Sequence, residues 1–128
     1  MLRLNSVPGN VAEVENLVDR VVNRYRLSPD QKGTILISLT EAVTNAIRHG
    51  NASDESKSVE VRHRKLRNRL SFSISDEGDG FDYNNLPDPT APENILKCGG
   101  RGVFLMRQLA DELEFRNNGS TVEMRFNL

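Results

Sequence analysis

A carboxylate and an amide stand four residues apart in the segment EAVTNAIRHG at residues 41–50. If this segment is helical, Glu41 and Asn45 are neighbours on one face. A carboxylate can orient or deprotonate an incoming hydroxyl, and an amide oxygen can complete the coordination of a magnesium ion already held by phosphates and water. The pair therefore predicts either a solvated helix face or a site for phosphate chemistry.

A second candidate is the acidic, glycine-containing segment SDEGDGFD at residues 75–82, which follows alternating apolar residues. It has three interpretations: an inert turn, a calcium loop, or a strand end that presents Asp76 as a hydrogen-bond acceptor for the amino group of a purine. A calcium loop beginning at Asp76 needs oxygen ligands at its third and fifth positions and glycine at its sixth. Those positions hold Gly78, Gly80 and Phe81, so the calcium interpretation fails.

The third candidate is GGRG at residues 99–102, directly before a segment with helical periodicity. Backbone N–H groups at a helix N-terminus attract phosphate, and glycines let the phosphate reach the backbone. Neither G-x-x-x-x-G-K-[ST] nor a complete G-x-G-x-x-G occurs in the chain. Gly100, Arg101 and Gly102 therefore predict a phosphate site outside the P-loop and dinucleotide-binding classes.

Apolar periodicity predicts the elements that position these groups. Asn10 with Glu13, and Ser28 with Pro29 and Gln31, are helix start signals. The expected helices run from Asn10 to about Tyr25, from Ser28 to Arg48 or His49, and from Val103 to about Ala110. The expected strands lie at residues 1–5, 59–61, 70–74, 113–115 and 122–126, with turns at 66–69 and 117–119. A long loop is expected from Asp76 to Arg101.

Helices with one apolar side and alternating strands predict an α+β fold, a two-layer sandwich with a mixed, mostly antiparallel sheet and its helices on one face. The 128 residues carry 17 basic and 18 acidic side chains, a net charge of -1, and one cysteine. This composition predicts a single domain over residues 1–128, with no global field for a nucleic acid and no internal disulfide. We expect a soluble cytoplasmic protein, since no apolar run is long enough for a membrane span.

The three motifs together resemble those of the ATPase superfamily that includes gyrase, sensor histidine kinases, a heat-shock chaperone and mismatch-repair proteins. Residues 41–50 resemble its asparagine box, residues 76–81 its first glycine box, and residues 100–105 its second. Within the superfamily, the segment EAVTNAIRHG in so short a chain is most similar to the anti-sigma-factor serine kinases of bacterial partner-switching systems. The resemblance runs from about Ser28 to the C-terminus and implies the histidine-kinase-like ATPase (Bergerat) fold.

Carried over to this sequence, the resemblance implies a role for each candidate residue. Glu41 is expected to be the catalytic base, Asn45 the magnesium ligand and Asp76 the adenine acceptor. Glycines 78 and 80 shape the adenine side, and residues 100–102 hold phosphates beneath an ATP lid at about 82–101. Thr121 resembles a threonine that helps to hold the base, although it also suits an ordinary β-branched strand residue.

The implied function is an ATP- and magnesium-dependent protein serine/threonine kinase that is also an anti-sigma factor. The expected substrate is an anti-anti-sigma (STAS-type) protein, and the expected alternative partner is a sigma factor or another regulator. Family members are commonly homodimers, and neither direct nucleic-acid binding nor membrane binding is expected. The alternative is a non-catalytic regulatory module that binds ATP or ADP, against which Glu41 argues because binding alone needs no base. A small calcium-binding or scaffold domain remains only if all three motifs are coincidental.

Overall fold

The structure is a computed structural model that describes residues 1–78 and 100–128, with the backbone alone for residues 100–104. Its elements follow the predicted order of strand, two helices, two strands, helix and two strands. They are β1 (Leu2–Asn5), α1 (Ala12–Tyr25), α2 (Pro29–Asn45), β2 (Ser58–Lys65), β3 (Arg69–Ser75), α3 (Gly100–Leu109), β4 (Glu112–Arg116) and β5 (Thr121–Asn127), with short turns η1 (Pro8–Val11), η2 (Ala46–Gly50) and η4 (Asn117–Gly119).

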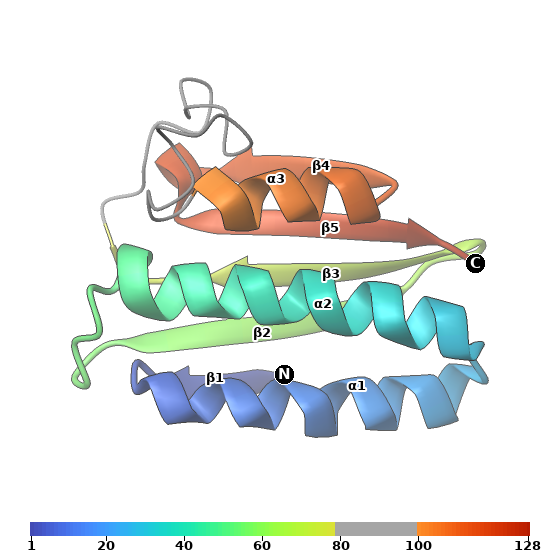
Figure 1. Ribbon diagram of the computed structural model, residues 1–128, viewed down its shortest axis with the longest axis horizontal. Helices are drawn as coiled ribbons and strands as arrows, with labels where there is room; N and C mark the ends of the chain where they lie inside the picture. The colour runs from blue at the N-terminus through green and yellow to red at the C-terminus, as the bar shows by residue number, and fades with distance from the viewer. Residues whose placement is uncertain (79–99) are drawn as a thin grey trace.

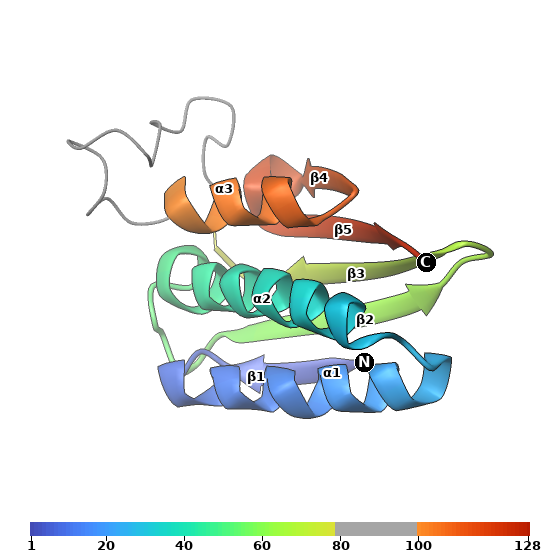
Figure 2. The same ribbon diagram turned by 45° about the vertical axis from the view of Figure 1, so that its right-hand side comes forward.

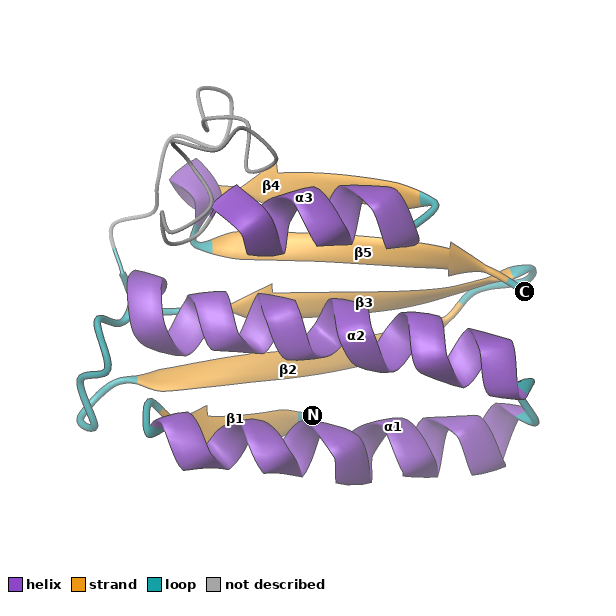
Figure 3. Ribbon diagram, in the orientation of Figure 1, coloured by secondary structure: helices purple, strands orange, loops and turns teal. Residues whose placement is uncertain are grey.

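The strands form one sheet in the order β1-β2-β3-β5-β4, and the three helices lie on the same face of it (Figure 1, Figure 3). The predicted two-layer α+β sandwich is confirmed. Every strand pairing in the described part of the chain is antiparallel, so the sheet is not mixed there. Short turns join β2 to β3 and β4 to β5, so the two strands of each hairpin run antiparallel.

The predicted capping box at the start of α2 is confirmed. The Gln31 N–H donates to Ser28 Oγ at 3.1 Å, and the Ser28 N–H donates to Gln31 Oε1 at 2.8 Å. Two N–H groups that the helix leaves unpaired are thereby satisfied. This cap fixes the start of α2, and with it the position of residues 41 and 45 along the helix.

The predicted start of α1 at Asn10 is wrong. The Asn10 side chain donates to the Asn5 carbonyl oxygen at 3.0 Å, and α1 begins at Ala12 without a side-chain cap. A 3-10 turn over Pro8–Val11 leads into the helix instead. Asn10 therefore stabilises the connection from β1 rather than the first turn of α1.

The core lies between the helices and one face of the sheet. Leu70, Phe72 and Ile74 alternate along β3 and are buried, as the period of two predicts. Phe72 and Phe126 meet edge to face with ring centroids 6.0 Å apart. Burial of each large apolar side chain contributes about 1.5–3 kcal/mol, which makes this layer the main support of the fold.

One end of the sandwich gathers the segments that carry the predicted site. The C-terminal end of α2 with η2, the end of β3, and the starts of α3 and β5 all lie at the left of Figure 1. The turned view in Figure 2 shows the same grouping. Segments far apart in sequence, residues 41–50, 75–78, 100–102 and 120–121, thus come to one edge of the molecule.

Within residues 1–78 and 100–128, no helix combines the length and apolar character that a membrane span requires.

Candidate functional site

The outward side of α2 carries the first predicted pair. Ala42 and Val43 are buried, whereas Glu41 and Asn45 are half-buried on the side away from the core. Among the described residues, neither side chain of this pair has a hydrogen-bond or ion-pair partner. Both keep their oxygen atoms available to a ligand or to water.

α2 ends in η2, one turn of π-helix over Ala46–Gly50. The Asn51 N–H donates to the Ala46 carbonyl oxygen at 2.8 Å, which is the five-residue spacing of a π-turn. The sequence predicts a helix to Arg48 or His49, and the structure confirms that helical backbone extends this far. The sequence does not predict that the last turn is a π-turn. This turn delivers Gly50 to the end of β3.

Asp76 lies in a corner made by two glycines. A Cβ built at Gly50 would be 2.7 Å from Asp76 Oδ1 and closer still to Oδ2, so a side chain at residue 50 would displace this carboxyl group or the turn. A Cβ at Gly78 would overlap the Gly50 carbonyl group. Gly50 is therefore a further residue of the candidate site, whose contact with Asp76 the sequence does not reveal although the residues HG that end the first motif include it.

Two backbone hydrogen bonds hold Asp76 in this corner. Its N–H donates to the Ser120 carbonyl oxygen at 2.9 Å, which extends the pairing of β3 with β5 by one residue. Its Oδ1 accepts from the Gly78 N–H at 2.8 Å. The remaining carboxylate lone pairs can accept hydrogen bonds from a ligand, as the interpretation of Asp76 as a purine acceptor requires.

Burial raises the pKa of Asp76 above its ordinary value of 3.8, while the Gly78 N–H and the Lys57 charge oppose this rise. A carboxyl group whose charged form is poorly solvated gains from any donor that a ligand supplies. The electrostatics of the corner therefore favour a ligand with an N–H donor.

The Thr121 side chain has polar contacts with Ser75 and Asn117. Thr121 pairs with Ser75 across the β3–β5 ladder, and residues in register share a face of the sheet. Ser75 is on the face opposite the buried Ile74, and the Thr121 hydroxyl lies 3.0 Å from Ser75 Oγ and 3.1 Å from Asn117 Nδ2. These contacts suit an ordinary β-branched strand residue, and the role of Thr121 beside the base stays a prediction.

The phosphate motif lies inside α3 rather than before it. α3 begins at Gly100, three residues earlier than periodicity predicts, so Gly100 and Gly102 belong to its first turn. The first four N–H groups of a helix have no partner within it, so these amides keep the donors that a phosphate needs. Gly80, the predicted lid up to residue 99 and the side chain of Arg101 lie outside the described residues.

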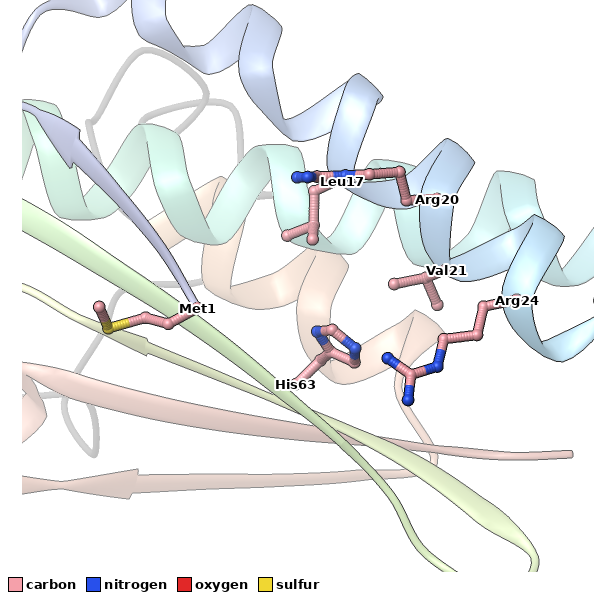
Figure 4. Close-up of a pocket in the computed structure, with 6 residues that line it drawn as sticks. All are labelled: Met1, Leu17, Arg20, Val21, Arg24 and His63. Carbon is pink, nitrogen blue, oxygen red and sulfur yellow. The ribbon is translucent and has the colours of Figure 1, made fainter.

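A cavity of about 190 Å³ lies elsewhere, between α1, β2 and the start of β1 (Figure 4). It is lined by Met1, Leu17, Arg20, Val21, Arg24 and His63. Burial, the N-terminal charge, Arg24 and Arg20 lower the pKa of His63, so this imidazole is neutral at neutral pH. The lining includes none of the predicted site residues, so the cavity is not part of the candidate site.

A known family of domains resembles this chain over nearly its whole length. The sequence profile of the histidine kinase-like ATPase domain matches residues 4–126. The chain belongs to the histidine kinase-like ATPase family. The resemblance stated from the three motifs is confirmed.

Relatives within this family are named as protein kinases. The serine-protein kinase RsbW of Bacillus subtilis (strain 168) is 30% identical over 130 residues, which cover 96% of this chain and 81% of the relative. RsbW of Bacillus licheniformis is 31% identical over 91% of this chain and 78% of the relative. RsbW of Staphylococcus aureus (strain JH9) is 34% identical over 96 residues, which cover 69% of this chain and 60% of the relative.

A solved structure has the same fold. The histidine kinase domain from the Erythrobacter litoralis EL346 blue-light activated histidine kinase superposes with a TM-score of 0.58 over 98% of this chain and 62% of that one. The two sequences are 19% identical, so this likeness concerns the fold alone. It supports the two-layer sandwich as the fold of this chain.

Proposed function

We propose that this protein is an ATP-dependent serine/threonine protein kinase, which transfers the γ-phosphoryl group of ATP to a hydroxyl group of a partner protein. The proposal is supported by the family, by relatives that are named serine-protein kinases at 30–34% identity, and by the site. The observation that carries it is the Asp76 corner, where two glycines make room around one fixed carboxylate.

The corner suits adenine. The amino group of adenine donates to a carboxylate, whereas guanine and hypoxanthine place a carbonyl oxygen at the same position and would face like partial charge. A site built to pair a polar group discriminates strongly against an analogue that leaves the group unpaired. Asp76 is therefore assigned to base recognition, with Gly78 and Gly80 shaping the adenine side.

The phosphate groups belong at the other side of the site. The amide oxygen of Asn45 has no partner among the described residues, and magnesium prefers oxygen ligands from one or two side chains together with substrate phosphates. No cluster of three metal-binding side chains occurs in the described residues, which fits an ion held mainly by a nucleotide. The amides of residues 100–102 and the Arg101 guanidinium are assigned to the phosphates.

Glu41 is assigned as the general base. It is one helical turn before Asn45 on the same face, so a hydroxyl group that meets Glu41 also approaches phosphates bound near Asn45. Glu41 takes the hydroxyl proton, the hydroxyl oxygen bonds to the γ-phosphorus, and ADP leaves. Positioning and electrostatic stabilisation supply most of the rate in such a transfer.

The partners are assigned from the resemblance of the motifs to anti-sigma-factor kinases. We infer a STAS-type anti-anti-sigma protein as the substrate, and a sigma factor or another regulator as the protein that the kinase sequesters. Phosphorylation adds about two negative charges to the substrate surface and so releases it from the kinase. A cytoplasmic homodimer is part of the same assignment.

The proposal is tested by incubating γ-labelled ATP with the protein and a candidate partner. Wild type should transfer label to a serine or threonine of the partner. Glu41→Gln should bind ATP with unchanged affinity and lose transfer by about 10²–10⁴-fold, the usual contribution of a general base. Thr40→Ala, one residue earlier on α2, is the matched control. Nucleotide binding without transfer to any cognate partner would instead favour a non-catalytic regulatory module.

A further inference from the structure

Asn51 is a buried amide at the end of η2. The residue is 1% exposed, and the hydrogen bonds of its side chain join it to other segments. Asn51 Nδ2 donates to Ser6 Oγ at 2.8 Å and to the Ser58 carbonyl oxygen at 3.0 Å, while Oδ1 accepts from the Glu77 N–H at 2.7 Å. One side chain thus joins the end of β1, the start of β2 and the turn after β3.

The contact with Glu77 bears directly on Asp76. The Glu77 N–H belongs to the peptide group between Asp76 and Glu77, so its direction sets the geometry of the turn that carries the carboxylate. Glu77 Oε2 also accepts from the Ser58 N–H at 2.5 Å, which ties the same turn to β2. The next N–H, that of Gly78, reaches back to Asp76 Oδ1.

The backbone after Asn51 is strained. Ala52 and Ser53 have φ angles of 51° and 56°, in the left-handed region that is unfavourable for residues with a side chain. Hydrogen bonds hold this conformation: the Ser53 N–H donates to the Ile47 carbonyl oxygen, and the Asp54 N–H donates to the Asn51 carbonyl oxygen. Such strain persists where surrounding contacts over-determine the geometry, and it clusters at ligand sites.

We propose that Asn51 is a positioning residue for adenine recognition. Its Oδ1 atom holds the peptide group of residues 76–77, and through it the Asp76 carboxylate, in the direction that accepts the amino group of the base. The inference rests on the proposed nucleotide site and deepens it. Asn51 itself does not touch the base.

The test compares the dissociation constants of magnesium ADP and magnesium IDP, measured by calorimetry. IDP carries hypoxanthine, which has a carbonyl oxygen in place of the adenine amino group. Wild type should prefer ADP by about tenfold or more, the difference that one charge-assisted hydrogen bond provides. Asn51→Leu should lower this preference at least fivefold, because the Glu77 N–H loses its acceptor and the carboxylate shifts.

Two further variants separate positioning from general stability. Asn51→Asp keeps an oxygen acceptor for Glu77 and loses the two donors, so it should keep most of the preference for ADP while lowering the melting temperature. Ser6→Ala removes the hydroxyl that accepts from Asn51 Nδ2 and should leave the preference within twofold of wild type. A merely structural Asn51 would lower the melting temperature in both Asn51 variants without changing the ratio of the two dissociation constants.

The outcomes are distinguishable from those of the proposed function. If wild type shows no preference for ADP, the assignment of Asp76 fails. If wild type has the preference and a folded Asn51→Leu keeps it, only the positioning role of Asn51 is overturned. Should Asn51→Leu not fold, amide exchange in wild type with ADP decides: a protected Glu77 N–H supports the proposal, and an unprotected one overturns it.

Discussion

The two ends of the candidate site are built differently. At the base end, Asp76 is held by backbone hydrogen bonds to Ser120 and Gly78 and lies against Gly50. At the other end, Glu41 and Asn45 are half-buried on a helix side and have no polar partner among the described residues. One end is formed by long-range contacts, and the other by the spacing of one helix.

This difference assigns separate roles to the two ends. Groups held before a ligand arrives lose little freedom on binding, so they favour affinity and selectivity. We expect Glu41 and Asn45, which have no polar partner among the described residues, to take up their working geometry only with phosphates, magnesium and a hydroxyl group in place. We therefore expect substitutions near Asp76 to alter base recognition, and substitutions on α2 to alter metal dependence and transfer.

The largest effect is expected from Gly50→Ala. The added Cβ overlaps the Asp76 carboxyl group, which must turn away or push η2 outward. We expect ADP affinity to fall more than tenfold, and the free energy of unfolding to fall by about 1–3 kcal/mol. Calorimetry and denaturant unfolding measure the two quantities.

Gly33→Ala in α2 is the matched control, because a Cβ there meets nothing within 4 Å. Replacing this half-buried helical glycine should raise the free energy of unfolding by about 0.5–1 kcal/mol and leave ADP affinity unchanged. Equal ADP affinity in Gly50→Ala and Gly33→Ala would show that the corner is not a ligand site.

The next effect is expected from Asn45→Ala. If Asn45 completes the magnesium shell, the gain in ADP affinity that magnesium provides should fall about tenfold, since magnesium binds through few protein oxygens. Affinity for ADP in the presence of a chelator should stay the same. Thr44→Ala, turned by about 100° on the helix, is the control. A magnesium dependence as large as that of wild type would contradict the assignment.

A smaller effect is expected from pH. The pKa of Asp76 is raised from 3.8 by burial, so the folded protein binds this proton more tightly than the unfolded chain does. Stability contributed by the neutral group is therefore present below pH 3.8 and is lost as the pH rises through the higher folded pKa.

Melting temperatures measured from below pH 3.8 to above the folded pKa of Asp76 should show this loss of stability in wild type. Asp76→Asn should lack it, because the amide does not titrate. ADP binding changes in the opposite direction, because it needs the charged carboxylate and so weakens as the pH falls through the raised pKa. Identical pH profiles of the two proteins would argue that Asp76 does not titrate in the corner.

The smallest effect is expected from Ala52→Gly in the strained turn. Glycine adopts the left-handed conformation without strain, so the free energy of unfolding should rise by about 0.5–1 kcal/mol. Ala12→Gly, where φ is -59°, should lower it by a similar amount. Denaturant unfolding of both variants checks the pair, and a loss of stability in Ala52→Gly would argue against strain at this turn.

Sequence analysis predicted the features that depend on neighbouring residues. The box of Ser28 and Gln31, the alternation along β3 and the shared face of Glu41 and Asn45 are each set by local spacing, and the structure confirms them. The sequence predicts the start of α3 three residues too late, because glycines favour a loop. The first turn of a helix tolerates them better, since its N–H groups have no partner within the helix.

Features set by tertiary contacts were not accessible in the same way. Gly50 meets Asp76 across 26 positions of sequence, and nothing local to either residue marks the approach. Asn51 stands in a small, polar segment that resembles any exposed loop, yet it is buried by partners from three other segments. Thr121 was singled out by its place after a turn, whereas its face of the sheet depends on register with Ser75.

The most direct test of the account is calorimetric titration of magnesium ADP into wild type and Asp76→Asn. The account predicts saturable binding to wild type and a loss of at least tenfold in affinity for the variant, which keeps the shape of the side chain and removes its charge. Equal affinity of the two proteins for ADP would contradict the claim that the corner at the end of β3 recognises adenine.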